Sequence, residues 1–397
     1  MRFRILPRVL ALGIALVPVL AAGPIRADDD GDEEVTVANL NILHGFICDP
    51  PVPGDGDQCR VRDRIDLLLQ HIEEVDCPDI VTLQENVTEE FVEVAPGVRV
   101  GPLDNTVELI EERLPKLEHE CDFGYQVVFD PEGATEPPAA LGRGIDEELI
   151  LSRYPALDAK VLPLYSPLDP FFSRHVLFAR IDHRSGPIDV FTTHLAGDSD
   201  FGSLPCGVQI LPPDLGGSPL CPTECVAFVD TVRECQAKQM ALLVEAHHNI
   251  PNPAVLTGDF NTEPFTNAYK EFTDRGWLDS HLAAGNAKCD FLTGENCTSG
   301  REDEDLSDLG SPDLNVDRRI DYIFVVPAAA GPTCAGAIEP IKGSKDFDQV
   351  PTGLFAAVPN PFTDDCGPLP DEICWASDHS GNIATLLCEG EDDDGDD

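Results

Sequence analysis

The stretch AVLTGDFN, residues 254–261, is the most informative part of this sequence for the fold. Its apolar first half predicts a buried strand over residues 254–257, and an acid and an amide follow where that strand ends. Because side chains alternate along a strand, we expect Phe260 to point into the core and Asp259 and Asn261 to point the other way. The stretch therefore predicts a strand end that carries chemistry.

Similar apolar segments recur along the chain. Strands are predicted over 35–42, 80–83, 125–129, 147–152, 174–181, 188–193, 319–326 and 382–387, and helices over 61–75 and near 105–118 and 224–247. The strands outnumber the helices, and many loops are longer than one turn, which favours mixed sheets packed together with helices outside. We find no internal repeat and no long linker, so a single large domain is expected.

Polar residues stand repeatedly at the ends of these apolar strands, where a core has no use for them. Carboxylate and amide oxygens suit a hard cation such as Mg²⁺, and two histidines suit proton transfer near neutrality. Together they provide what phosphoester hydrolysis requires, whereas no Gly-rich phosphate loop and no G-x-S-x-G motif is present. The residues are Asn41, Glu85, His194, Asp259, Asn261, Asp321, Asp378 and His379.

Seven motifs carry a resemblance to a known family. In chain order they are NLNILHG (39–45), LQE (83–85), LSRYP (151–155), TTHL (192–195), TGDFN (257–261), RIDYIF (319–324) and SDH (377–379). In this order, over residues 35–388, the chain resembles the endonuclease/exonuclease/phosphatase superfamily, which includes deoxyribonuclease I, abasic-site endonucleases, inositol phosphatases and neutral sphingomyelinases. The resemblance implies an α+β fold of four layers, an α/β/β/α sandwich of two packed mixed sheets flanked by helices.

The resemblance also implies roles for the polar residues. Glu85 would be the principal Mg²⁺ ligand, with Asn41 beside it contacting metal or phosphate and Asp378 as a further ligand. Asp259 and Asn261 would position the phosphate and the attacking water. Mn²⁺ and Ca²⁺ are alternatives to Mg²⁺ as the working ion.

The two histidines would handle protons and charge. His379 would be the general base, held and made more basic by Asp321, while His194 would stabilise the phosphoryl oxygens or protonate the leaving group. The sequence leaves open which histidine takes which part. His44 and Arg174 are further candidates for lining the site, with structural roles as the alternative.

Residues 1–27 predict export. They combine four arginines with an apolar run over 9–17 and small residues near 21–28, where a signal peptidase would cut. An acidic segment (28–34) and an acidic tail (389–397) border the catalytic domain expected over 35–388. No later segment is apolar enough to cross a bilayer, so we expect a secreted or periplasmic monomer.

The even number of cysteines, 14, predicts disulfides in such a compartment. Short spacings favour Cys48–Cys59, Cys289–Cys297 and Cys366–Cys374, and other pairings stay open. An insertion with four more cysteines is a candidate cap over the site: Cys206, Cys221, Cys225 and Cys235. Two sequons, at 86–88 and 296–298, predict glycosylation in a host with that machinery.

For the substrate, two features resemble the sphingomyelinase branch. HLA at 194–196 is similar to that branch's His-Leu-Gln-Ala, although the glutamine is missing, and Arg233 with Gln236 is similar to its Arg-x-x-Gln. An apolar segment at 354–358, with Phe362, would seek a lipid headgroup surface if exposed; the alternative is a disulfide-held loop packed on its own domain.

The alternatives are an extracellular endonuclease and, in another class, a catalytically inactive binding module on the same fold. A net charge of −47 repels a polyanion at long range and disfavours nucleic acid, although bound cations can reverse the local sign. Only scattered arginines are available to track a DNA backbone: Arg60, Arg62, Arg64, Arg318 and Arg319.

Overall fold

The computed structural model describes residues 33–43, 60–88, 92–95, 98–100, 103–128, 147–167, 173–184, 186–198, 201–206, 221–222, 225, 229–249, 252–300, 316–326, 338–340 and 376–388. All of them fall within one unit, Asp32–Asp397. His44, the apolar segment at 354–358, the acidic tail and the predicted pairs Cys48–Cys59 and Cys366–Cys374 lie outside the described residues.

The first sheet has six strands in the order β13-β14-β1-β2-β6-β5. Its central strand β1 runs parallel to β2 and antiparallel to β14, so the sheet is mixed. The pairing of β1 with β14 brings the first and the last described strands of the chain side by side. The strands are β1 (Glu33–Asn41), β2 (Ile80–Asn86), β5 (Gln126–Val128), β6 (Glu147–Ser152), β13 (Ile338–Pro340) and β14 (Asn382–Cys388).

The second sheet also has six strands, in the order β11-β12-β10-β9-β8-β7. β9 and β10 are parallel and the other neighbours antiparallel, so this sheet is mixed too. The strands are β7 (Ala156–Leu164), β8 (Arg174–His183), β9 (Gly186–His194), β10 (Ala254–Asp259), β11 (Leu278–Asp279) and β12 (Asp321–Val326). A separate hairpin joins β3 (Val92–Ala95) and β4 (Val98–Val100).

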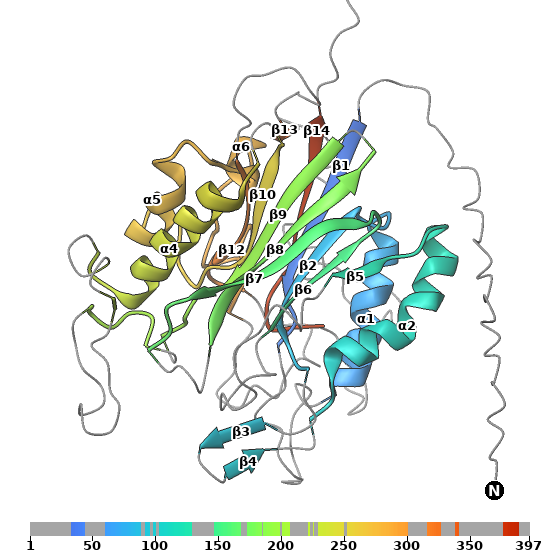
Figure 1. Ribbon diagram of the computed structural model, residues 1–397, viewed down its shortest axis with the longest axis horizontal. Helices are drawn as coiled ribbons and strands as arrows, with labels where there is room; N and C mark the ends of the chain where they lie inside the picture. Colours follow the sequence, from blue (N-terminus) through green and yellow to red (C-terminus); the bar gives the residue numbers. More distant parts are fainter. Residues whose placement is uncertain are drawn as a thin grey trace, which may run out of the picture. The chain divides into compact units, whose positions relative to one another are not determined.

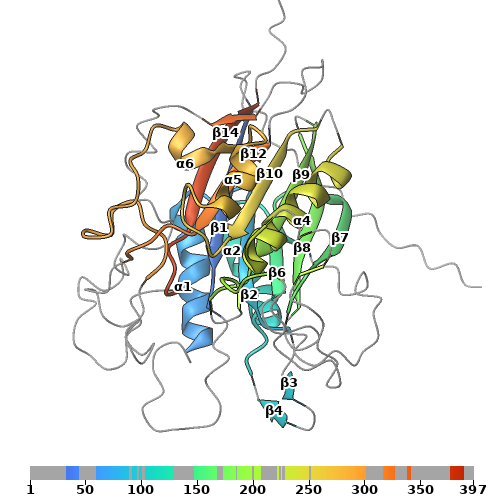
Figure 2. The same cartoon turned by 90° about the vertical axis from the view of Figure 1, so that its left-hand side faces the viewer.

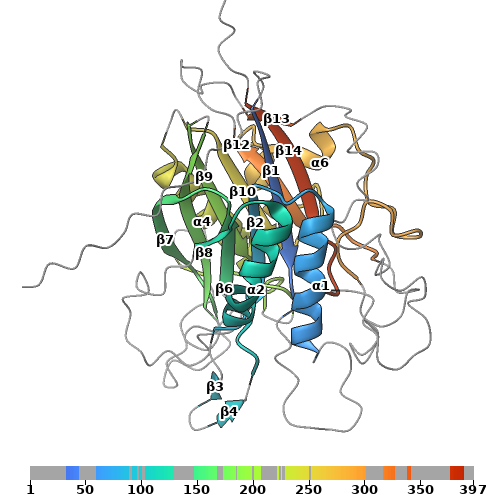
Figure 3. The same cartoon turned by 90° about the vertical axis from the view of Figure 1, so that its right-hand side faces the viewer.

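Helices cover both outer faces (Figure 1). α1 (Val61–Glu74) and α2 (Thr106–Cys121) lie in front of the first sheet in Figure 3, and α4 (Val232–His247) and α5 (Asn267–Thr273) lie in front of the second in Figure 2. The short α6 (Ser280–Ala283) follows β11. The expected four-layer sandwich is confirmed, with α4 beginning several residues later than the predicted 224.

Three apolar cores separate the four layers, and strand alternation sorts residues between them. On β10, Leu256 packs on the helix side, whereas Val255 packs between the sheets. On β1, Val37 lies between the sheets and Leu40 faces α1 and α2. The layer between the sheets is therefore built from every second residue of its strands, as a period of two requires.

That middle layer changes from apolar to polar toward one end. Asn39 continues the face of Val37, and its Oδ1 accepts hydrogen bonds from Thr82 Oγ1 and Gln84 Nε2, both at 2.9 Å. Gln84 Nε2 also donates to Thr192 Oγ1 of the second sheet at 3.0 Å. These buried bonds join the two sheets just before the strands end.

Four disulfides are present among the described residues: Cys77–Cys121, Cys206–Cys221, Cys225–Cys235 and Cys289–Cys297. The last confirms the prediction from spacing, and the middle two tie together the insertion expected to cap the site. Several disulfides in one domain indicate an oxidising, extracellular-type compartment. None of the helices in the described part of the chain is long and apolar enough to span a bilayer.

Candidate active site

The site forms where the polar end of the middle layer meets the strand ends. Strand register places three of the expected residues side by side, because Asp259 of β10 pairs with His194 of β9 on one flank and with Asp321 of β12 on the other. Gly258 makes this register possible: its φ is 144°, and a Cβ there would lie 2.0 Å from the carbonyl oxygen of Thr193. Only glycine lets the two strands approach this closely.

Glu85 reaches the site from the first sheet through a local irregularity. Its φ is +62°, and the pairing of β2 with β6 shifts register between Leu83 and Asn86. Asn86 holds this bulge, since its side-chain amide donates to the carbonyl oxygens of Leu83 (3.0 Å) and Glu147 (3.1 Å). A bulge of this kind redirects a side chain that regular pairing would have pointed elsewhere.

Asn41 joins the two sheets at the site. Its Nδ2 donates to Glu85 Oε1 at 2.7 Å and to Asp259 Oδ2 at 3.1 Å, while its Oδ1 accepts from the backbone N–H of Leu43 at 3.0 Å. The bond to the N–H of Leu43 fixes which end of the amide faces the carboxylates. Two buried or nearly buried carboxylates thus share one amide group, an arrangement that attracts a cation.

His194 lies between these carboxylates. Its Nδ1 is 3.9 Å from Glu85 Oε1 and its Nε2 is 3.3 Å from Asp259 Oδ2. Asn261, with φ +48°, places Nδ2 at 2.9 Å from both His194 Nε2 and the carbonyl oxygen of Leu195. The backbone N–H of His194 donates to Glu148 Oε1 at 2.8 Å, so a buried carboxylate of β6 also holds this residue.

His379 and Asp321 form a buried pair, with Nδ1 of the imidazole 2.9 Å from Oδ2 of the carboxylate. Nε2 of His379 lies 3.8 Å from Asp259 Oδ2. Burial raises the pKa of Asp321 to about 6, although the charge of His379 opposes this and Asp259 adds to it. Burial alone would lower the pKa of His379, but the charges of Asp321, Asp378 and Asp259 raise it well above 6.5.

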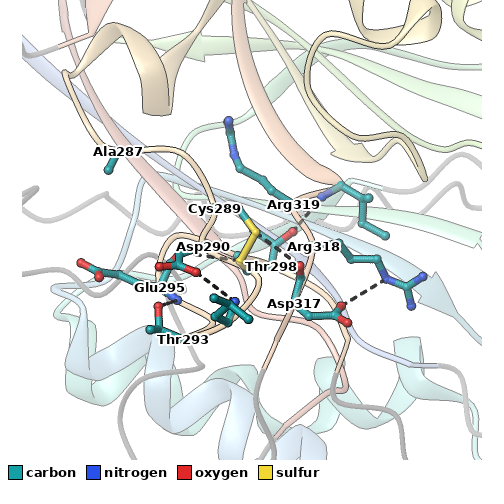
Figure 4. The surroundings of a disulfide bond; sticks show 12 residues. Ala287, Cys289, Asp290, Thr293, Glu295, Thr298, Asp317, Arg318 and Arg319 are labelled. Atoms are coloured by element: carbon teal, nitrogen blue, oxygen red, sulfur yellow. Dashed lines mark hydrogen bonds and ion pairs between the residues drawn. A yellow bond between two sulfur atoms is a disulfide. The ribbon is translucent and has the colours of Figure 1, made fainter.

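The segment after the Cys289–Cys297 disulfide contacts this pair directly. Thr298 Oγ1 accepts hydrogen bonds from the backbone N–H groups of Ile320 and Asp321, both at 3.1 Å, and Ser299 Oγ lies 3.4 Å from His379 Nε2. Figure 4 shows the Cys289–Cys297 disulfide with Thr298 beside it. Asp290, Thr293 and Glu295 lie on one side of the disulfide, and Asp317, Arg318 and Arg319 lie on the other.

Arg64 of α1, named from the sequence only as a cation for a DNA backbone, is instead buried beside the site. It is 2 % exposed, and its guanidinium donates to the backbone carbonyls of Ile42, Leu43 and Ala376. Burial lowers its pKa to about 10, partly offset by the charges of Asp378 and Glu85. Arg64 therefore joins the end of β1 to the segment that carries Asp378 and His379.

Seven of the eight residues singled out at the strand ends are linked here by contacts shorter than 4 Å, and the eighth, Asp378, directly precedes His379. Asp378 is buried, and its Oδ1 accepts from Ser377 Oγ at 3.1 Å.

Arg174 is buried at the start of β8. Arg233 and Gln236 bond to the backbone of Ala196, with Nε of Arg233 donating to its carbonyl and Oε1 of Gln236 accepting from its N–H, each at 2.8 Å. These two residues thus fix the chain that follows His194.

Both sequons are buried in the folded domain. Asn86 is 0 % exposed and its amide holds the bulge beside Glu85, while Asn296 is 8 % exposed and precedes the buried Thr298. A glycan on Asn86 is incompatible with this packing, because its side-chain nitrogen is buried and donates to two backbone carbonyls.

The donor set fits a divalent cation. Among the described residues, Asp259, Asp321 and His379 offer ligand atoms within 4.8 Å of one another, all buried, and Glu85 supplies a further carboxylate next to Asp259 through Asn41. Carboxylate oxygens are the ligands that hard cations prefer. A candidate metal site is therefore present, built from residues of both sheets.

Comparisons with known proteins concern the family and the fold. Residues 38–379, which include every residue of the site, match the profile of the Endonuclease/Exonuclease/phosphatase family. No curated protein sequence matches the chain. Among solved structures, an endonuclease/exonuclease/phosphatase family protein from Leptotrichia buccalis C-1013-b is similar with a TM-score of 0.50 at 14% identity, covering 89% of this chain and 99% of that one. Humanized D. rerio TDP2 carrying 14 mutations gives the same score and identity over 89% and 98% of the chains. At this identity the likenesses concern the fold.

Proposed function

Because the chain belongs to the Endonuclease/Exonuclease/phosphatase family and is a phosphoester hydrolase, we propose that it is a secreted, metal-dependent phosphodiesterase in which water attacks phosphorus. The observation that carries this proposal is the buried Asp321–His379 pair facing Asp259, with Glu85 and Asn41 on the opposite side. It combines a proton acceptor with a cluster of oxygen ligands in one place.

In this mechanism some protein residues position the water and the phosphate, and others transfer protons. Asp321 fixes Nδ1 of His379, which leaves Nε2 to take the proton of the attacking water. Asp259 and Asn261 orient that water and the phosphate, and His194 stabilises the phosphoryl oxygens or protonates the leaving group.

Glu85 is proposed as the main metal ligand and Asp378 as a further one, while Asn41, whose Nδ2 donates to Glu85 and Asp259, positions these carboxylates. Mg²⁺ is the proposed ion, with Mn²⁺ and Ca²⁺, which also take oxygen ligands, as the alternatives. The cation would supply positive charge that neutralises charge developing on the phosphoryl oxygens. Asp378 is one of the carboxylates whose charge raises the pKa of His379, so a cation held there would offset part of that effect.

For the substrate, we propose a small or lipid phosphodiester, with an endonuclease as the alternative. The disposition of the five arginines supports this choice. Arg64 and Arg319 are buried, and Arg60, Arg62 and Arg318 form ion pairs with Asp63, Asp104 and Asp317. Buried arginines do not reach a phosphate backbone, and the neighbouring acids reduce the positive charge that the exposed ones offer to it.

The test uses the oxidised chain without residues 1–27, assayed with Mg²⁺ and with EDTA against sphingomyelin vesicles, plasmid DNA and bis(4-nitrophenyl) phosphate. Glu85→Gln and His379→Ala should each reduce turnover by at least 100-fold, and His119→Ala, at an exposed position of α2, is the matched control. Chelator-insensitive turnover would contradict the metal proposal. Cleavage of DNA but not of the two small phosphodiesters would favour the endonuclease.

A further inference from the structure

The segment Thr298-Ser299 lies between the two halves of the Asp321–His379 pair. On one side, the backbone N–H groups of Thr298 (2.7 Å) and Ser299 (3.0 Å) donate to the carbonyl oxygen of Arg318. On the other side, the N–H of Ser380 donates to the carbonyl oxygen of Thr298 at 2.6 Å. Ser299 also forms isolated β-bridges with both Arg318 and His379. The backbone of this segment thus connects the start of β12, which carries Asp321, to the segment before β14 that carries His379.

The hydroxyl of Thr298 replaces a missing strand partner. β11 pairs with β12 only opposite Phe324 and Val325, so within the described residues no strand covers the outer flank of β12 at Asp321. There the Thr298 Oγ1 accepts the N–H groups of Ile320 and Asp321, both at 3.1 Å. Thr298 is 1 % exposed, so water cannot easily take over these two bonds.

The hydroxyl of Ser299 lies at the working face of the imidazole. Ser299 is 1 % exposed, and its Oγ is 3.4 Å from Nε2 of His379, the nitrogen that does not contact Asp321. A hydroxyl can donate to a neutral nitrogen or accept from a protonated one. At 3.4 Å the contact is loose, so Ser299 can restrict the orientation of the ring while Nε2 remains able to accept a proton from water.

A disulfide fixes the entry to this segment. Cys297 directly precedes Thr298, is 1 % exposed and is bonded to Cys289 across a separation of 8 residues. The enclosed loop is tightened further, since the N–H of Asp290 donates to the carbonyl oxygen of Glu295 at 2.8 Å. A closed loop this short leaves Thr298 little freedom at its N-terminal side.

We propose that Thr298 and Ser299 are positioning residues for the Asp321–His379 pair, and that the Cys289–Cys297 disulfide holds them in place. Thr298 fixes the backbone position of Asp321, and Ser299 restricts the orientation of the His379 imidazole. Because both residues directly follow the disulfide-closed loop, a displacement of the loop moves both contacts together. This inference rests on the proposed function, because it assigns these residues to the same reaction.

The kinetic test uses bis(4-nitrophenyl) phosphate and the oxidised chain without residues 1–27. Thr298→Val keeps the shape but removes the acceptor, and it should lower kcat about 10- to 100-fold while KM stays within about twofold. Thr298→Ser restores the acceptor and should return kcat to within about threefold of the wild type. A kcat of Thr298→Val equal to that of the wild type, or of Thr298→Ser as low as that of Thr298→Val, would overturn the proposal.

The disulfide has a matched control in the same chain. The double variant Cys289→Ser with Cys297→Ser should lower kcat about tenfold. Cys77→Ser with Cys121→Ser, which opens the bond between the segment after α1 and the end of α2, should leave kcat per folded molecule unchanged. Thermal unfolding of each variant gives the folded fraction at the assay temperature. Equal losses in the two double variants would show that the Cys289–Cys297 loop has no special relation to the pair.

A readout without catalysis separates this inference from the proposed function. In histidine-labelled protein, the imidazole resonances of His379 should shift in Thr298→Val and in the Cys289/Cys297 variant, while those of His71 on α1 stay in place. If the wild type cleaves no phosphodiester, the proposed function fails but these shifts still decide the inference. Unmoved His379 resonances would refute it whatever the activity.

Discussion

Acid should destabilise this domain through a buried histidine of α1. His71 is 1 % exposed, and burial lowers its pKa from 6.5 to about 4. Between these values the unfolded chain binds a proton that the folded chain does not, so acid favours unfolding. The stabilising contribution is complete above pH 6.5 and is lost as the pH falls toward 4.

The magnitude follows from the two pKa values. Each pH unit between them is worth about 1.36 kcal/mol, which gives about 3 kcal/mol below pH 4, and about 2 kcal/mol of this is already lost at pH 5. Since a domain is typically stable by only about 5 to 15 kcal/mol, this is a large share. Burial also lowers the pKa of His281 to about 4, so a second contribution of the same sign adds to it.

Urea unfolding at pH 7.5 and pH 5.0, with EDTA present to exclude metal binding, measures the effect. Between the two pH values the wild type should lose about 2 kcal/mol more free energy of unfolding than His71→Gln, which cannot titrate there. His119→Gln, at an exposed position of α2, should follow the wild type. The reasoning is refuted if wild type and His71→Gln lose the same free energy.

Three further predictions concern residues around the site. Arg319→Met leaves the buried Asp279 carboxylate without its ion-pair partner and should lower the free energy of unfolding by about 3 to 5 kcal/mol, measured by urea titration at pH 7.5. A loss below about 1 kcal/mol would contradict the burial of this pair. Arg64→Met removes the donor for three carbonyls, so it should lower the free energy of unfolding by about 3 kcal/mol and also lower the Mg²⁺ affinity measured by calorimetry. An unchanged Mg²⁺ affinity would show that Arg64 does not support the metal site. Glu148→Leu removes the acceptor for the His194 N–H and should reduce kcat about tenfold or more, whereas Glu148→Gln keeps an oxygen there and should reduce kcat less. Equal losses of kcat would show that the charge of Glu148 matters and not its hydrogen bond to His194.

Much of the architecture follows from local pattern. The strand-end residues were predictable because hydrophobic runs stop at Asn41, His194 and Asp259, and register then brings them together. β7 was missed because it lies at a sheet edge, buries few side chains and contains Pro163, all of which weaken the alternation that marks a strand. Edge strands of this kind are recognisable only after their partner is known.

The supporting residues were hidden for a different reason. Thr298 and Arg64 act through backbone groups of distant segments, and nothing in their own neighbourhood distinguishes them from a surface threonine or arginine. Glu85 was predicted from its motif, but its positive φ depends on Asn86 bonding across to β6. Such contacts depend on tertiary structure, which sequence periodicity does not encode.

The place of β1 in its sheet has a consequence for how the active enzyme appears during synthesis. β1 pairs with β14 from Asn39 opposite Asn382 to Glu33 opposite Cys388, and Ser377 Oγ donates to the carbonyl oxygen of Asn41 at 2.6 Å. A chain that leaves the ribosome from its N-terminus therefore lacks His379 and the antiparallel partner of β1 until its last described strand has emerged. A hydrolase built in this way stays inactive until its last described strand is in place, and it gains activity only at that point.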